Sequence, residues 1–319
     1  MPVWNRISDA NAGIASSVSN AISIVEWRNP GVLRAVSCGD MVILSDYSGQ
    51  HKNSLYEAYS FLVTNMEAIS EWTEIRREFR ERWLPDGRRI SFKQLNEKMR
   101  GRAYPHYLAA CSFLKANIIT FLVHRNIKCF IDGGASSFMS LFPECFSSQT
   151  KHGTAEKMIR LSTFLSVVIT GLRQENQRAF WFSDHDEALE TYERREGFAK
   201  LSTYLQLNFS KWSRPADVIF GTTGDPSIPC WVEDLAALPD IFCGAYCQIG
   251  NILPSFYGKE TWTKMFNSSS VIDKRPRILG DWLAAGHSNL RHILVRTEIE
   301  DSGFFRSSAQ FFRPLVCTW

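Results

Sequence analysis

Three aspartates stand at the ends of apolar segments, or at a helix start, and these segments lie far apart in the chain. They are Asp46 in Met41-Val-Ile-Leu-Ser-Asp46, Asp184 in Ala179-Phe-Trp-Phe-Ser-Asp184, and Asp240 in Leu238-Pro239-Asp240-Ile-Phe-Cys-Gly244. A carboxylate buried at the end of an apolar strand costs free energy unless a partner or a cation compensates it. Carboxylates brought together also repel one another, and a divalent metal is the usual remedy. The pattern therefore predicts a carboxylate-bound metal site and a metal-dependent hydrolase.

The charge balance of the chain gives little guidance about a partner. The 319 residues carry 36 basic and 33 acidic side chains, for a net charge of +3. This charge is too weak to predict nucleic-acid binding by itself, although a local basic patch is compatible with it. The hydrophobic fraction of 45%, with 22 Phe and 10 Trp, is sufficient for a large core in one domain or two.

The cysteines and the apolar segments indicate the compartment. The eight cysteines form no Cys-x-x-Cys pair, and several lie in apolar stretches, as buried thiols do in a reducing compartment. Cys243 and Cys247 are one helical turn apart, but no suitably spaced His or Cys completes a metal site, which favours core packing. The N-terminus has no basic segment followed by an apolar run, and no stretch approaches the roughly 20 apolar residues of a membrane span. We therefore expect a soluble cytoplasmic protein of prokaryotic type.

Hydrophobic periodicity predicts strands and helices that follow one another along the chain. Strands are expected at 41–47, 54–63, 117–123, 127–132, 179–183, 216–221 and 291–298. Helices are expected at 7–26, 66–84, 91–116, 154–172 (with Thr154 as its cap), 187–206 and 276–285, while 133–153 is expected to be a loop. A further helix is expected to start at Pro239, with Asp240 just inside it. Antiparallel strands followed by parallel ones predict an α/β fold with a mixed sheet flanked by helices.

This order of elements, with an Asp on the first strand, the fourth strand and the last helix, resembles the RNase H-like fold. More closely, it looks like a prokaryotic domain family of unassigned function with a first-strand Asp-Glu-Ser-Gly and a late-helix Ala-Asp-Leu-x-Ala-Gly. The matching segments here are Asp46-Tyr47-Ser48-Gly49, Phe180-Trp181-Phe182-Ser183-Asp184-His185-Asp186-Glu187 and Pro239-Asp240-Ile241-Phe242-Cys243-Gly244. The resemblance covers residues 41–250, with the helices at 66–116 inserted.

The chain departs from the family's pattern at several positions. Tyr47 replaces the expected Glu, and Cys243 stands where Ala is usual. RNase H-type enzymes also carry a Glu on the first core helix, and Glu156 is the only acidic residue near that helix start. We do not assign Glu156 to the site. Glu233 or Asp234, just before the last helix, is the expected source of a fourth carboxylate.

The resemblance implies a metal-dependent nuclease that hydrolyses phosphodiester bonds. It implies Mg²⁺ or Mn²⁺ held by Asp46, Asp184 and Asp240, where the metal activates a water and stabilises the leaving oxygen. Further metal ligands are Glu233 and, if Asp184 points away, Asp186. Backbone N–H groups at Ser48 and Gly49, together with Lys93, are expected to contact nucleic acid, either DNA or RNA.

The resemblance also divides the chain into three sections. Residues 1–40 form an N-terminal arm, and 41–256 form the RNase H-like domain with its helical insertion near 66–116. Residues 257–319 form a C-terminal helix and strand that pack on the same domain. A homodimer or a protein partner stays open.

Two other functions fit parts of the sequence. Asp184-x-Asp186 after an apolar strand also suits a haloacid-dehalogenase-type phosphatase or a nucleotide-sugar transferase, but these leave Asp46 unexplained. Tyr47 also suits a catalytically degenerate RNase H-like fold that binds nucleic acid or protein in a defence or mobile-element system. A catalytic site would gather Asp46, Asp184 and Asp240 around shared metal positions, whereas a degenerate one would leave them splayed or paired with Lys or Arg.

Overall fold

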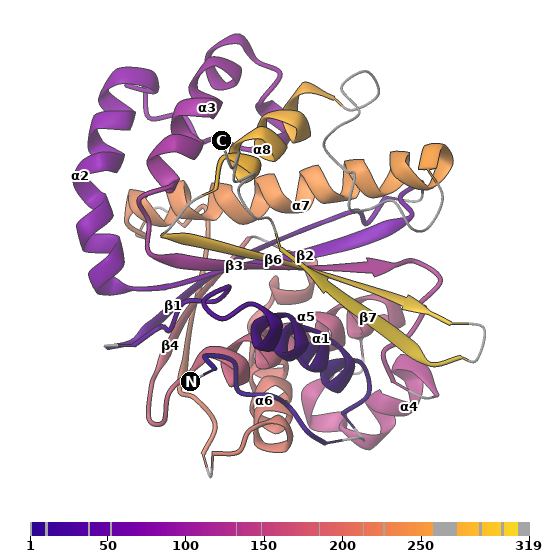
Figure 1. The fold of residues 1–319 in the computed structure, drawn as a ribbon. Helices are drawn as coiled ribbons and strands as arrows, with labels where there is room; N and C mark the ends of the chain where they lie inside the picture. The colour runs from indigo at the N-terminus through magenta and orange to yellow at the C-terminus, as the bar shows by residue number, and fades with distance from the viewer. Residues whose placement is uncertain are drawn as a thin grey trace.

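One mixed β-sheet organises the chain, and helices cover both of its faces (Figure 1). The structure is a computed structural model that describes residues 2–9, 12–37, 39–51, 53–131, 133–147, 149–184, 186–212, 214–225, 227–257, 273–286, 289–300 and 303–311. The strands are β1 (Met41–Ser48), β2 (Tyr56–Asn65), β3 (Ala116–His124), β4 (Ala179–Ser183), β5 (Val218–Thr222), β6 (Leu290–Ile299) and β7 (Phe305–Gln310). The α-helices are α1 (Ile14–Arg28), α2 (Met66–Trp83), α3 (Lys98–Cys111), α4 (Gly134–Leu141), α5 (His152–Leu172), α6 (Tyr192–Phe209), α7 (Cys230–Tyr257) and α8 (Lys274–Ala285). Short 3-10 turns are η2 (Phe92–Gln94), η3 (Pro143–Cys145) and η4 (Glu187–Leu189).

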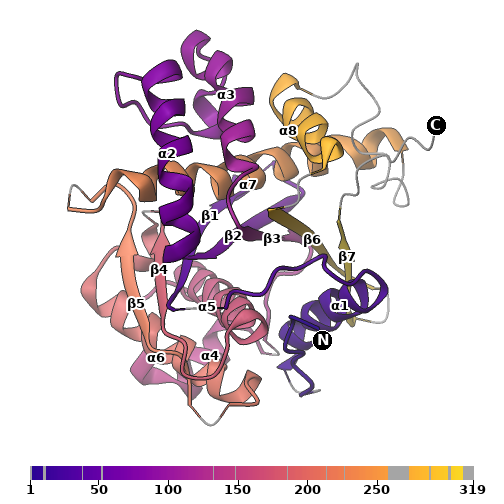
Figure 2. The ribbon, with the colours of Figure 1, turned by 60° about the vertical axis from the view of Figure 1, so that its left-hand side comes forward.

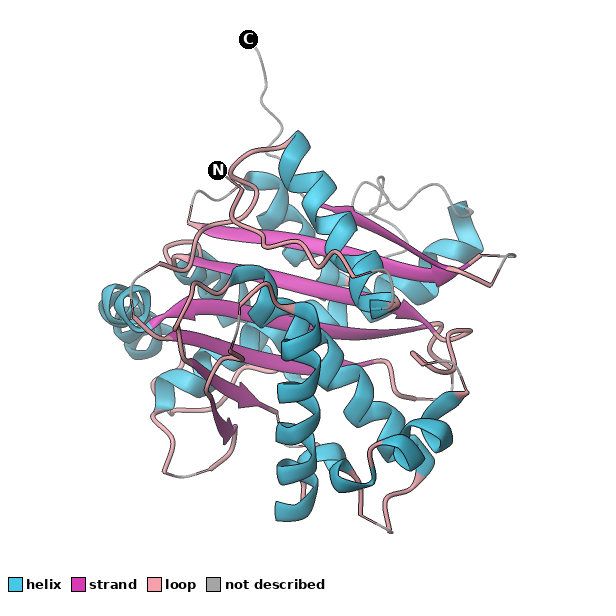
Figure 3. Ribbon diagram, turned by 90° about the horizontal axis from the view of Figure 1, so that it is seen from below, coloured by secondary structure: helices cyan, strands magenta, loops and turns pink. Residues whose placement is uncertain are grey.

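The strands lie side by side in the order β5-β4-β1-β2-β3-β6-β7. Figure 3 shows them as one sheet with helices packed against it. β1, β2 and β3 form an antiparallel meander, whereas β4 runs parallel to β1 and β5 parallel to β4. β6 is parallel to β3, and β7 returns antiparallel to β6. This arrangement confirms the predicted fold class, a mixed α/β sheet flanked by helices, and is consistent with an RNase H-like fold. Because β1, β4 and β5 run in the same direction, their carboxyl ends meet at one edge of the sheet.

Each face of the sheet carries its own apolar core. Helices α1, α4, α5 and α6 cover one face, and α2, α3, α7 and α8 cover the other (Figure 2). Successive side chains of a strand point to opposite faces. In β1, Ile43 accordingly joins the core on the α5 face and Leu44 the core on the α7 face. This alternation decides which residues at the end of β1 can reach α7.

Three local expectations are wrong. Residues 127–131 form no strand, because Ile127 and Phe130 turn into the α5-face core instead of joining the sheet, and Asp132 lies outside the described residues. The expected loop at 133–153 contains α4, whose Phe138 is buried in the same core. Thr154 is not a cap, since α5 already begins at His152 after Lys151.

The start of the last core helix is also corrected. α7 begins at Cys230, so Pro239 and Asp240 lie well inside it rather than in its first turn. A proline within a helix removes one backbone hydrogen bond, but the buried apolar face of α7 outweighs that loss. Gly244 brings α7 close to Phe92 of η2, because a Cβ there would lie 2.2 Å from the Phe92 ring. Asp240 therefore lacks the favourable dipole of a helix start.

The first and last sections of the chain join the same cores. α1 begins at Ile14, later than expected, and packs against α5 and β7. β6 and β7 extend the sheet beyond β3. The division into an arm, a core domain and a C-terminal section stays a prediction. Within the described ranges, no helix has the length and apolar character needed to cross a membrane.

Candidate carboxylate site

Asp46, Asp184 and Asp240 converge at the edge of the sheet where β1, β4 and β5 end. All three line one polar pocket of about 480 Å³. β1 and β4 are paired up to Ser45 and Ser183, and the N–H of Asp184 donates to Ser45 O at 3.1 Å, which places residues 46 and 184 beside each other. Asp240 comes from α7, which packs against β1 and β2. The structure thus brings together the three residues that the sequence singled out.

The side chain of Asp46 is the most deeply placed of the three. It is only 6% exposed, and its Oδ1 accepts the N–H of Tyr47 at 2.6 Å. Burial, followed by the charges of Asp240 and Asp184, raises the pKa of Asp46 well above its usual value. The Tyr47 N–H and the Arg89 guanidinium oppose this rise but do not cancel it. Asp46 therefore sits in negative potential that is only partly compensated.

Asp240 has a similar but milder environment. Burial raises the pKa of Asp240 to about 6. The N–H of Phe92 and the positive charges of Arg89 and Lys93 lower it, but by less. The Phe92 N–H donates to Asp240 Oδ2 at 2.7 Å. The approach of α7 to η2 thus fixes the carboxylate but does not neutralise it.

Asp184 accepts hydrogen bonds from two side chains. Its Oδ1 accepts from Thr223 Oγ1 at 2.8 Å and from Arg89 Nη2 at 3.4 Å. Arg89 also lies 3.1 Å from Glu233 Oε2, measured from its Nε. One arginine therefore links two carboxylates at the mouth of the pocket.

The residues predicted to contact nucleic acid line the same pocket. Ser48, Gly49 and Lys93 are all part of its wall. Gly49 has a φ of +86°, and a Cβ on it would lie 2.2 Å from Tyr56 O, so only glycine fits this turn. Whether these residues contact a substrate stays a prediction.

The additional carboxylates of the sequence prediction have other partners. Asp186 pairs with Lys157 and accepts the N–H of Ala188 at the start of η4, so it does not line the pocket. Glu233 faces the neighbouring pocket, where it accepts the N–H of Gly224 and pairs with Arg89.

Asp234 and Glu156 lie apart from the pocket as well. Asp234 is buried and pairs with Arg76 and Arg80 of α2. Glu156 pairs with Arg160 one turn along α5 and lines a different pocket. Because each is engaged by an arginine of its own, neither supplies the fourth carboxylate in this arrangement.

The two departures from the family motifs have structural explanations. The Tyr47 hydroxyl turns to the α5 face and contacts Ser45 Oγ at 2.7 Å and Ser183 Oγ at 2.9 Å. The thiol of Cys243 donates to Asp46 O at 2.9 Å, which ties α7 to the end of β1. Both residues therefore join the strand ends rather than enter the carboxylate cluster.

The donor set of the pocket suits a hard divalent cation. Carboxylate oxygens are the ligands that Mg²⁺ and Mn²⁺ prefer. Burial, with a smaller contribution from the neighbouring aspartates, raises the pKa of both Asp46 and Asp240, and a bound cation would offset this cost of ionising them. Over the described ranges, however, no three His, Cys, Asp or Glu side chains are arranged closely enough to enclose a metal ion. The pocket therefore has oxygen ligands suited to a metal ion, and the positive charge next to them is that of Arg89, 3.4 Å from Asp184.

Arg89 and Thr223 are the residues that sequence reasoning missed. Arg89 follows the helix-breaking Pro85-Asp86-Gly87, and nothing in its local sequence marks it. Thr223 belongs to Gly221-Thr-Thr-Gly224 after β5, a segment too short to predict a role. Only the parallel pairing of β4 with β5 indicates that Thr223 would reach Asp184.

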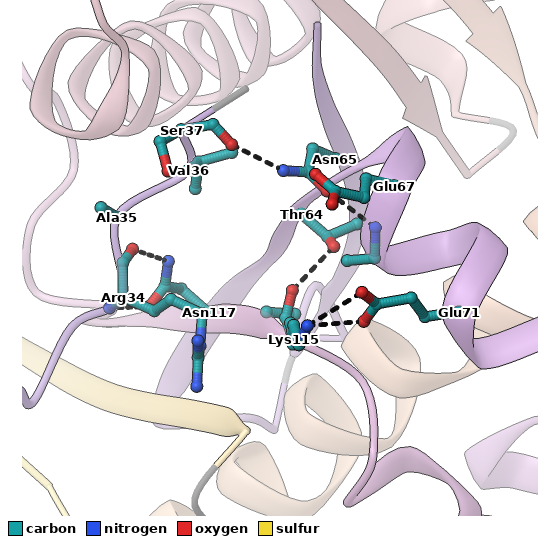
Figure 4. A pocket seen from close by; sticks show the side chains of 12 residues that line it. Arg34, Ala35, Val36, Ser37, Thr64, Asn65, Glu67, Glu71, Lys115 and Asn117 are labelled. Atoms are coloured by element: carbon teal, nitrogen blue, oxygen red, sulfur yellow. Dashed lines mark hydrogen bonds and ion pairs between the residues drawn. The ribbon is translucent and has the colours of Figure 1, made fainter. Parts of the chain in front are cut away.

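A second pocket at the opposite end of β1 offers a contrast (Figure 4). It has a volume of about 140 Å³ and lies beside the start of β3 and the end of β2. Asn117 accepts the N–H of Arg34 and donates to its carbonyl, both at 2.8 Å, and Lys115 pairs with Glu71 at 2.7 Å. Lys115 and Glu71 thus balance each other's charge, and the backbone of Arg34 satisfies the amide of Asn117.

Comparisons with known proteins find weak similarities among solved structures alone. No family model matches the sequence, and no curated protein matches it. Among solved structures, the ribonuclease H2 of Pyrococcus horikoshii OT3 is similar with a TM-score of 0.36 and 14% identity, over 76% of this chain and 85% of that one. RNase HII of Archaeoglobus fulgidus, solved in a complex with PCNA, is similar with a TM-score of 0.32 and 12% identity, over 80% and 94%. At these TM-scores and identities, neither similarity indicates an activity for this chain.

Proposed function

We propose that this protein is a metal-dependent nuclease that hydrolyses phosphodiester bonds in nucleic acid. The observation that supports this most directly is the convergence of Asp46, Asp184 and Asp240 in one pocket, where burial and mutual repulsion make it costly to ionise Asp46 without a cation. A protein that only needed these positions for folding would be more stable with neutral side chains there. Such a cluster fits a site that accepts a divalent cation.

In this proposal Asp46, Asp184 and Asp240 hold Mg²⁺ or Mn²⁺. A bound metal would supply a water of lowered pKa and charge stabilisation for the leaving oxygen. Thr223 and the Phe92 N–H orient the carboxylates of Asp184 and Asp240. The backbone at Ser48 and Gly49 and the side chain of Lys93 would bind the phosphates of the substrate on the pocket wall.

A second candidate function is a catalytically degenerate fold that binds nucleic acid or a partner protein. The ion pair between Arg89 and Asp184 favours this alternative, because an arginine beside a carboxylate can replace a metal as the permanent counter-charge. The absence of a ready metal-enclosing set in the described part of the chain also supports it. The two candidates differ in whether a divalent metal binds at Asp46.

Further parts of the proposal follow from the same resemblance. We propose membership of the prokaryotic family with the Asp-Glu-Ser-Gly motif, a cytoplasmic location, and Glu233 and Asp186 as outer carboxylates that could move toward a metal. A separate core domain at 41–256, with its arm and C-terminal section, belongs to the same proposal. Whether the partner is a second copy or another protein is left to experiment.

The test is a cleavage assay on labelled single- and double-stranded DNA and RNA with Mn²⁺ or Mg²⁺. Asp46→Asn is compared with the wild type, because it removes the charge and keeps the shape. We expect it to lower the rate by at least about 100-fold, since losing even an outer residue of a metal site costs about 10- to 100-fold. Chelator should abolish cleavage by the wild type.

The matched control is Asp40→Asn, the same change just before β1, where Asp40 pairs with Arg178 at 2.6 Å. It should leave the cleavage rate unchanged. Absence of cleavage by the wild type, together with unchanged thermal stability on adding Mn²⁺, would refute the nuclease and favour the binding protein.

A further inference from the structure

Arg89 stands between two pockets that meet at the carboxylate site. It lines both the carboxylate pocket and a neighbouring pocket of about 720 Å³. Its side chain is about one third exposed, at 34%. The neighbouring pocket is also lined by Arg76, Arg80 and Glu233. A ligand that extends from one pocket into the other would therefore pass over the Arg89 guanidinium.

The backbone on both sides of Arg89 is held in place by other arginines. Arg80 Nη1 donates to Arg88 O, and Arg100 Nε donates to Arg89 O, both at 2.7 Å. Arg80 is itself anchored by the buried carboxylate of Asp234 on α7. Contacts from α2, α3 and α7 thus fix the loop that carries Arg89, so its approach to the carboxylates is built into the fold.

The guanidinium of Arg89 is not fully used by its present partners. Its contact with Asp184 is long, at 3.4 Å, and its Nε has no hydrogen-bond partner although Glu233 Oε2 lies 3.1 Å away. The Nε–H is therefore misaligned with the nearby carboxylate. A buried donor left without an acceptor is costly, and a missing ligand is one explanation for it.

A phosphate needs such a cation at this site. Asp46, Asp184 and Asp240 together would repel a nucleic-acid backbone. Arg89 and Lys93 are the Lys and Arg side chains that line the carboxylate pocket. Of the two, Arg89 presents a planar fork of donors that matches two phosphate oxygens at once.

We propose that Arg89 is a substrate-binding residue whose guanidinium contacts a backbone phosphate of the nucleic acid between the two pockets. This inference rests on the proposed function and adds a specific contact to it. When a divalent cation compensates Asp184, the arginine is released to bind the phosphate. A purely structural counter-ion would instead stay on Asp184 with or without substrate.

The experiment measures binding of short fluorescent oligonucleotides, single- and double-stranded DNA and RNA, by anisotropy at several salt concentrations. Ca²⁺ replaces Mg²⁺ so that cleavage does not interfere. We expect Arg89→Ala to weaken binding about tenfold and to lower the slope of log Kd against log salt by about one, as the loss of one phosphate contact does. Arg89→Lys should recover part of the affinity, because it keeps the charge without the fork.

Arg88→Ala is the matched control, because it removes the same charge at the adjacent residue, which pairs with Asp86 and lines neither pocket. It should bind like the wild type. If the wild type binds and Arg89→Ala binds with the same Kd and the same salt slope, this inference alone is overturned. Tighter Mn²⁺ binding by Arg89→Ala would then identify Arg89 as a structural counter-ion. Failure of the wild type itself to bind any oligonucleotide would instead refute the proposed function. Thermal melting of each variant verifies that it is folded.

Discussion

The pockets at the two ends of β1 differ in how their charges are matched. At the carboxyl end, three aspartates share one arginine contact and a few backbone N–H groups, and the pKa of Asp46 rises well above its usual value. At the other end, Asn117, Thr64 and Lys115 each have a matched neighbour (Figure 4). Both are hollows at the edge of the same sheet. The difference shows that imbalance of charge, rather than the presence of a cavity, marks a candidate site.

A second contrast lies within α7 itself. Asp234 and Asp240 belong to the same helix, yet Asp234 is neutralised by Arg76 and Arg80 while Asp240 faces other carboxylates. Asp234, the structural carboxylate, is the more deeply buried of the two, and Asp240 is partly buried, so depth of burial does not identify the candidate ligand. What distinguishes the two carboxylates is the charge of the residues that each one contacts in the folded chain.

The largest effect on the free energy of unfolding is expected from Asp240, at the carboxyl end of β1. The folded protein keeps the Asp240 proton up to about pH 6, whereas the unfolded chain releases it near 3.8. The metal-free protein should therefore lose stability as pH rises between these values, and the loss should persist above them. Asp240→Asn keeps the acceptor for the Phe92 N–H and removes the charge, so it should be more stable at pH 7 by up to about 3 kcal/mol.

Urea denaturation in the presence of chelator at pH 4 and pH 7 measures this difference. The gain of Asp240→Asn should be present at the higher pH and small at the lower. Equal stability of the two proteins at both pH values would mean that this end of β1 is as well balanced as the other. The same variant should lose the proposed cleavage activity, so stability and activity should change in opposite directions.

A substitution at the other end of β1 should instead lower stability and leave the proposed cleavage activity unchanged. Asn117→Ala removes two hydrogen bonds to the backbone of Arg34 at a fully buried position. Since each such bond contributes about 1 kcal/mol, we expect a loss of about 2 kcal/mol in the free energy of unfolding. The rate of cleavage per folded molecule should not change. A fall in that rate would show that the two ends are coupled.

The smallest effect is expected at the Lys115–Glu71 ion pair of the same pocket. Both side chains are nearly half exposed, at 45% and 48%, and exposed pairs contribute less than about 1 kcal/mol. Glu71→Gln should therefore change the free energy of unfolding by less than that amount, and added salt should remove the change. Measuring the melts at low and high salt tests both statements. A larger, salt-independent loss would contradict a solvent-screened pair.

Much of the fold could be predicted because it depends on local patterns. The apolar runs at β1 and β4 predict that Asp46 and Asp184 lie near strand ends, as observed. The sequence misplaces the start of α7, because proline is typical of the first position of a helix, whereas this buried apolar helix contains Pro239 in its interior. Residues 258–272 and 312–319 of the expected C-terminal section lie outside the described residues, so that part of the expectation stays a prediction.

The sequence by itself determined that carboxylates end two strands of an α/β sheet, since strand period and apolar runs are properties of neighbouring residues. Only the tertiary structure decided which carboxylates remain uncompensated. Arg89 meets Asp184 across 95 residues of chain, and Arg76 and Arg80 meet Asp234 across 158 and 154. Such pairs depend on which helices and loops face each other, which no local pattern specifies. The charge balance of the site, and with it the proposed roles of Asp46 and Arg89, is therefore a property of the fold.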